Sequence, residues 1–214
     1  TMRDHILSLL FDHWDGLRAG RLAPFRAEIN PRAFSPALEH MFILETLGPD
    51  DTRIRLAGMR LCNMMGMEVR GKPAISLMKS DSRAQMARII RQVTSKPSVA
   101  EITLRAYDFS NAQYDASMLL LPLRSDFGVI DRIIGAVSLN SHNYSPPLGF
   151  DILEVNITDV KEGIIDAPAL PGFAEAQGGY SVEGAPGLHA VDGNPTATRG
   201  APRGQFRVVK GGRD

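Results

Sequence analysis

This 214-residue sequence has little cysteine, no excess of charge of either sign and no long apolar run. Its single cysteine, Cys62, cannot form a disulfide within the chain or a cysteine-rich zinc site. Its 24 lysines and arginines balance 24 aspartates and glutamates, so charge does not mark it as a binder of nucleic acid or of a membrane surface. No apolar run approaches the roughly 18 residues of a membrane span, and the N-terminus lacks the pattern of a signal peptide. We therefore expect a cytoplasmic protein that neither inserts into membranes nor binds nucleic acid.

Glycine and proline gather in the last part of the chain. Ten glycines and five prolines fall among the 48 residues 167–214, a share above the roughly 25–30% that indicates disorder. The apolar residues there are too scattered to offset the entropy of ordering the chain, and a short run at Phe206–Val209 is either a docking strand or a chance cluster. We expect a disordered tail over 167–214, a C-terminal extension over 143–166, a folded domain over 37–142, and an N-terminal helix with a connector over 1–36.

Apolar side chains recur every three or four residues near the N-terminus, which predicts an amphipathic helix that ends near Gly20. Such an apolar stripe needs a partner surface, either the sheet of its own chain or a second subunit. We predict a homodimer that involves this helix through Ile6, Leu10, Trp14 and Leu17. Residues 22–36 hold three prolines and no regular period, which favours an extended connector.

The middle of the chain shows strand and helix patterns in turn. Two strands over 41–47 and 53–57 form a predicted hairpin, and a helix is predicted over 80–94. Three further strands are predicted over 99–107, 114–123 and 130–139, joined by short turns. This order lacks the regular alternation of a parallel sheet. We therefore predict an α+β fold with a five-stranded antiparallel sheet and a helical crossover on one of its faces.

Three groups of residues resemble the PAS domain, in particular the single-domain PAS family of alphaproteobacteria. They are Trp14-x-x-Leu17-Arg18-x-Gly20-Arg21-x-x-Pro24-x-Arg26 with Ile29-x-Pro31; Arg55-Leu56-Ala57-Gly58-x-Arg60-Leu61-Cys62 with Gly66-x-Glu68-x-x-Gly71; and Leu121-Pro122-Leu123-Arg124 with Gly128, Arg132 and Gly135. Met59 departs from the pattern, because that family often has a small hydroxyl residue there. The resemblance implies a PAS-like sheet with a cavity beneath the crossover, and a role in sensing or in protein contacts.

The same resemblance bears on two cofactors. Haem-binding PAS domains commonly supply an axial histidine from the long crossover helix, and residues 80–94 contain none. Photoactive flavin PAS domains carry a cysteine shortly after a Gly-Arg pair, and Ala74 stands at the matching position here. We therefore expect neither haem nor a covalent flavin photocycle, while non-covalent flavin binding stays open.

Methionine is concentrated where a PAS cavity would have its wall. Six of nine methionines fall in the crossover, where they either fill the core or adapt to an apolar ligand. Cys62 is read either as a small buried hydrophobe or as a redox sensor. The expected ligand-binding residues are Cys62, Met65, Met78, Ile89, Leu104, Leu119 and Ile134 on the walls, with Arg60 and Glu68 at the mouth.

Arginine forms a basic concentration at positions 18, 21, 26, 55 and 60. We interpret these side chains as solvated ion pairs with nearby carboxylates, and leave a surface site for a phosphate group or cyclic dinucleotide open. No nucleophile elbow, phosphate-binding loop, zinc-protease motif or Cys-x-x-Cys pair occurs, so we do not expect an enzyme. The sequence favours a sensory module that binds a small apolar or amphipathic ligand or a signalling partner. The alternative is a ligand-free adaptor that acts through its sheet face or its tail.

Overall fold

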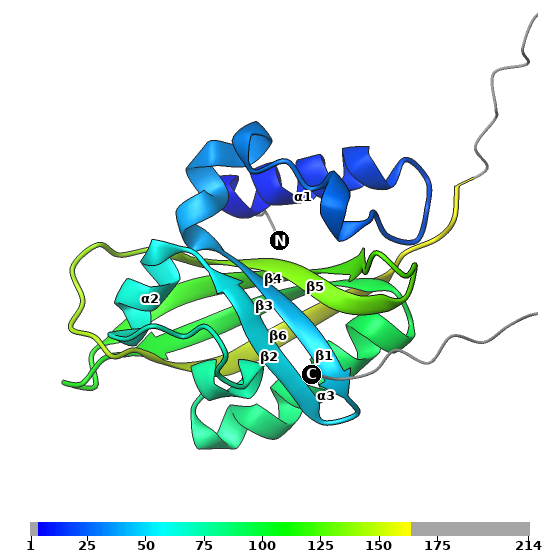
Figure 1. Ribbon diagram of the computed structural model, residues 1–214. Helices are drawn as coiled ribbons and strands as arrows, with labels where there is room; N and C mark the ends of the chain where they lie inside the picture. The colour runs from blue at the N-terminus through cyan, green and yellow to red at the C-terminus, as the bar shows by residue number, and fades with distance from the viewer. Residues whose placement is uncertain (1–3, 164–214) are drawn as a thin grey trace, which may run out of the picture. The chain divides into compact units, whose positions relative to one another are not determined.

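The fold is an antiparallel sheet with helices on both faces, seen in a computed structural model that describes residues 4–163 (Figure 1). The helices are α1 (His5–Arg18), α2 (Met59–Met65) and α3 (Ser80–Ser95), with 3-10 turns at η1 (Arg26–Glu28), η2 (Pro31–His40) and η3 (Ala74–Leu77). The strands are β1 (Met41–Gly48), β2 (Asp51–Ala57), β3 (Ser98–Tyr107), β4 (Gln113–Arg124), β5 (Ile130–Leu139) and β6 (Gly149–Asp159).

The sheet runs in the order β2-β1-β5-β4-β3-β6, with every neighbouring pair antiparallel. The predicted α+β class and antiparallel sheet are therefore confirmed, and the sheet has one strand more than the five expected. The additional strand, β6, comes from the segment expected to be a C-terminal extension, and it pairs along the whole of β3. The predicted disordered tail over 167–214 lies outside the described residues.

Apolar residues cover both faces of the central strands. Successive side chains of a strand point to opposite faces, so Met118 and Leu120 of β4 join the core beneath α2 and α3, while Leu119 and Leu121 join a second core beneath α1 and η2. Figure 1 shows α1 and α3 on opposite sides of the sheet. Burial on both faces explains why β4 and β5 read as nearly continuous apolar runs.

The segment between α1 and β1 differs from the predicted extended connector. It folds into η1 and η2, and Phe34 and Ala37 of η2 are buried against α1 and the sheet. Proline is compatible with the start of such turns, because its fixed φ suits the first helical position and its missing N–H would be unpaired there. Pro31, the first residue of η2, is therefore compatible with a 3-10 turn as well as with an extended chain.

Candidate functional site

The methionine-rich crossover packs directly on one face of the sheet. Met64, Met65, Met78 and Met86 are buried in the same core as strand residues of β3, β4 and β5. Four of the predicted wall residues meet in this core: Met65, Met78, Ile89 and Leu104. They come from α2, the residue after η3, α3 and β3, so the crossover and the sheet enclose them together.

Two predicted wall residues lie elsewhere. Leu119 and Ile134 belong to the second core, beneath α1 and η2, on the opposite face of the sheet. Their expected place beside Met65 is therefore wrong. The reason is the period of two in a strand: their neighbours Met118 and Ile133 point into the methionine-rich core instead. A sequence in which both faces are apolar carries no alternation that would separate them.

An open groove of about 700 Å³ lies on the outer side of α2. Cys62 and Glu68, both expected at the ligand site, line it, and Cys62 is half-buried there. The Cys62 thiol donates to Oε1 of Glu68 at 3.7 Å, and the backbone N–H of Arg70 donates to the same oxygen at 3.0 Å. The remaining lining residues are Ala57, Met59, Asn63, Gly66, Met67, Arg70 and Pro146.

The short helix α2 separates this groove from the core. Leu61, Met64 and Met65 face inward, whereas residues Met59 and Met67 are 70% and 52% exposed. The sequence analysis located six methionines in the crossover without separating inward from outward side chains. The spacing of Leu61, Met64 and Met65 was the available signal, since residues three or four apart share a helix face, whereas Met67 lies beyond the end of α2. Arg60 does not line the groove and donates from Nη2 to Nδ1 of His142.

Asp108 accepts several hydrogen bonds and holds the loop that carries Pro146, one of the residues that line the groove. Asp108, in the turn after β3, accepts hydrogen bonds from the hydroxyls of Ser110 at 2.6 Å and Tyr114 at 2.8 Å. It also accepts from the backbone N–H of Ala112 and, at 3.4 Å, from that of Ser145, next to Pro146. These bonds, that from Ser110 above all, lower the pKa of Asp108 from 3.8 to about 2, and Asp108 in turn raises the pKa of Tyr114.

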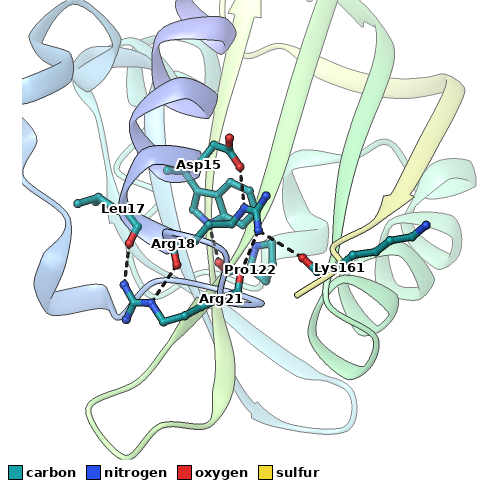
Figure 2. A network of polar contacts seen from close by, with 7 residues as sticks. Asp15, Leu17, Arg18, Arg21, Pro122 and Lys161 are labelled. Atoms are coloured by element: carbon teal, nitrogen blue, oxygen red, sulfur yellow. Dashed lines mark hydrogen bonds and ion pairs between the residues drawn. The ribbon is translucent and has the colours of Figure 1, made fainter. Parts of the chain in front are cut away.

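The apolar stripe of α1 packs against its own chain. Leu10 and Trp14 are buried beside strands β4 and β5, and Trp14 Nε1 donates to the carbonyl of Pro122 at 2.8 Å (Figure 2). The two side chains are thus unavailable as dimer contacts, and that part of the prediction is wrong. The sequence left two partner surfaces open for the apolar stripe, the sheet of its own chain or a second subunit, and in the structure the stripe packs on the sheet. Ile6 and Leu17, the other predicted dimer residues, are half-buried.

Two arginines of the basic concentration close the C-terminal end of α1. Arg18 lies over the Trp14 ring, pairs with Asp15 at 2.6 Å, and donates to the carbonyls of Arg21 and Lys161 (Figure 2). Arg21 donates to the carbonyls of Leu17 and Arg18, which a helix end leaves without intrahelical partners. This part of the N-terminal motif therefore has a capping role.

The described residues carry no group of three or more His, Cys, Asp or Glu side chains able to hold a metal ion. Over residues 4–163, no helix combines the length and the apolar character needed to cross a membrane.

Solved structures of light-oxygen-voltage domains are similar to this chain at low identity. One, solved in work on a flavin analogue, has a TM-score of 0.42 and 17% identity, and the match covers 52% of this chain and 84% of that one. The Rhodobacter sphaeroides light-oxygen-voltage protein has a TM-score of 0.40 and 19% identity, over 49% of this chain and 60% of that one. An RNA-binding light-oxygen-voltage receptor has a TM-score of 0.41 and 16% identity, over 51% of this chain and 33% of that one.

No curated protein matches the chain. A family model described as "PAS domain" matches residues 2–138, which is more than half of the 214 residues. That range takes in α1, the crossover and the strands through β5 except its last residue. The chain belongs to the PAS domain family.

Proposed function

We propose that this protein is a sensory or regulatory module that binds a small apolar or amphipathic ligand in the groove over α2. The observation that carries the proposal is the exposure of Met59 and Met67 side by side with half-buried Cys62 in one concave surface. PAS domains are generally sensory rather than catalytic, which agrees with a regulatory role.

The composition of the groove suits a ligand with an apolar body and one polar end. Thioether side chains are flexible and polarizable, so Met59 and Met67 can adapt to ligands of different shape. Asn63, Glu68 and Arg70 line the same groove and can orient a polar group. The ligand site that we propose is therefore on the outer side of α2, with the buried methionines behind it as deformable support.

A contact at the start of α2 offers a route from the groove to α1. Gly58 precedes α2, and its N–H donates to the carbonyl of Met41 at 2.8 Å. A Cβ at Gly58 would lie only 2.3 Å from the backbone oxygen of Leu38 in η2, so the two backbones are in close contact. In turn, η2 reaches α1, where the rings of Phe34 and His13 are 4.9 Å apart. A ligand that binds one position of α2 more tightly than another would shift the equilibrium between those positions to the extent that its two affinities differ. The contacts through Gly58 and η2 would then carry the movement of α2 to α1.

The first experiment is native mass spectrometry with an absorption spectrum of the freshly purified protein. A small molecule that co-purifies supports the sensor. A titration with the neutral dye Nile red then tests the groove: we expect binding to weaken in a Met59→Gln, Met67→Gln double variant and to be unchanged in Leu153→Gln, an exposed apolar residue of β6. Equal dye affinity in all three proteins would remove the groove from the proposal.

An adaptor role is the second candidate, and one observation favours it. Phe127 and Val129, in the turn between β4 and β5, are 92% and 58% exposed, and exposed apolar side chains that lie together often mark protein contacts. The homodimer and the cytoplasmic location remain predictions. Since Leu10 and Trp14 are buried within the subunit, a dimer would use other surfaces, and light scattering at high protein concentration would detect it.

A further inference from the structure

A second pocket lies on the opposite side of β1 from the methionine-rich core. It has a volume of about 380 Å³ and is formed by β1, β2, β5 and η1. Its lining residues are Arg26, Ile43, Glu45, Arg55, Leu56 and Arg132. Ile43 belongs to the core beneath α1, which confirms that the pocket opens on that face and is separate from the groove over α2.

A β-bulge in β2 aims two side chains into this pocket. Ile43 pairs with Leu56, but the next residue, Leu44, pairs with Ile54, so Arg55 has no partner in β1. In a regular strand, Arg55 and Leu56 would point to opposite faces. The bulge lets both line the same pocket, with Ile54 returned to the methionine-rich core. Bulges recur beside functional sites because they redirect side chains in this way.

The charges in the pocket do not balance. Glu45 pairs with Arg55 and accepts a hydrogen bond from Arg132 Nη2 at 3.0 Å. Among residues 4–163, the Arg26 guanidinium has neither a hydrogen-bond partner nor an ion-pair partner, and its side chain is exposed. Three arginines against one glutamate leave a net charge of +2 in the lining.

Glu45 holds two of the three arginines in place and offsets only one of their charges. Its side chain is only 14% exposed, and it fixes Arg132, which is 24% exposed, next to the more open Arg55 at 58%. Nε of Arg132 is buried without a hydrogen bond, and Asp131, whose carboxylate lies 3.8 Å from it, does not line the pocket. Preorganised guanidinium groups lose little side-chain freedom when an anion arrives.

We propose that this pocket binds a small soluble molecule that carries a phosphate monoester. A monoester has a charge of about −1.5 to −2 near neutral pH, which complements the net charge of the lining. Planar guanidinium groups match phosphate oxygens with paired hydrogen bonds. Ile43 and Leu56 offer an apolar surface for the group that the phosphate esterifies, and the volume lies within the range of small-molecule pockets, which begins at roughly 300 Å³.

Phenyl phosphate is a suitable probe, because it combines a phosphate monoester with one apolar ring. In a titration of isotope-labelled protein followed by NMR, we expect saturable shifts of backbone amides in β1, β2 and β5. Phenol, which lacks the phosphate, should cause none of these shifts, and inorganic phosphate should bind more weakly than phenyl phosphate because it leaves Ile43 and Leu56 uncovered.

The matched variants replace arginine by glutamine at different places. In the double variant Arg26→Gln, Arg55→Gln we expect the dissociation constant for phenyl phosphate to rise about tenfold or more, because each replacement removes a charge-assisted hydrogen bond to the phosphate. Arg88→Gln, an exposed position on α3 at the other side of the sheet, should leave it unchanged. Both proteins should keep the wild-type spectrum elsewhere, because the replaced side chains are exposed.

Three results would overturn the proposal. The first is the absence of saturable shifts at millimolar phenyl phosphate. The second is equal affinity in the double variant and the wild type. The third is binding of a phosphoserine peptide through the same arginines with no binding of phenyl phosphate, which would assign the pocket to a protein partner.

Discussion

The close approach between Gly58 and η2 gives a sharp test of the packing around α2. Alanine at this position would place its Cβ 2.3 Å from the Leu38 oxygen, 2.4 Å from the Glu39 oxygen and 2.5 Å from the Glu39 carbonyl carbon. The backbone angles of Gly58, φ −72° and ψ 157°, are open to any residue, so the cost of Gly58→Ala is steric alone. The atoms in the way belong to the backbone and cannot rotate aside.

Overpacking of this kind costs about 1–3 kcal/mol, and we expect the upper end because η2 must move as a unit. With a urea dependence of about 2 kcal/mol per molar, the unfolding midpoint should fall by about 1.5 M. Gly16→Ala is the control, because Gly16 lies within α1 with nothing within 4 Å of its Cβ position. That change should raise stability by up to about 1 kcal/mol through helix propensity. Equal midpoints for wild type and Gly58→Ala would refute the tight contact and the proposed route from the groove to α1.

Three other predictions concern stability. Trp14→Phe should cost about 1–3 kcal/mol, because the buried Pro122 carbonyl loses its donor, and an unchanged urea midpoint would contradict this. Met64→Ala should cost about 2–5 kcal/mol, whereas Met59→Ala should change stability by less than about 0.5 kcal/mol; similar losses for the two would contradict the orientation of α2. Asp108 has a folded pKa of about 2 against 3.8 unfolded, so its contribution is complete above pH 3.8 and is lost as the pH falls towards 2. Urea midpoints across this range should therefore depend less on pH in Asp108→Asn, and parallel curves would argue against the Asp108 network.

Most strands of the sheet could be predicted because each one shows a local pattern of apolar and polar residues in the sequence. The alternation of Arg53, Ile54 and Arg55 marks β2, and the turn residues before and after it set the hairpin. By contrast, β6 was missed although Val155 and Ile157 alternate with Glu154, Asn156 and Thr158, which is the pattern of a half-buried strand. The alternation is interrupted at Leu153, where the register with β3 shifts, so the remaining pattern is short.

The candidate sites depended on facts that a one-dimensional pattern does not contain. The face of Leu119 and of Ile134 is fixed by register with neighbouring strands, and the direction of Arg55 is fixed by a bulge that appears only when β1 and β2 are aligned. Pro146 reaches the groove from a loop about 80 residues beyond α2, where the Leu148 N–H donates to the Met64 carbonyl at 2.7 Å. Contacts between residues so far apart in the sequence arise only from the tertiary fold, and no local sequence pattern indicates them.

The strand order has a consequence for how the chain acquires this structure. The turns of the β3-β4-β5 meander are short, so these strands can associate at a small entropic cost, whereas β1 must wait for β5: Met41 pairs with Ala136, almost a hundred residues away. Trp14 likewise needs Pro122. During synthesis, α1 and β1 therefore wait longest for their partners, and their apolar residues stay exposed until β5 has left the ribosome.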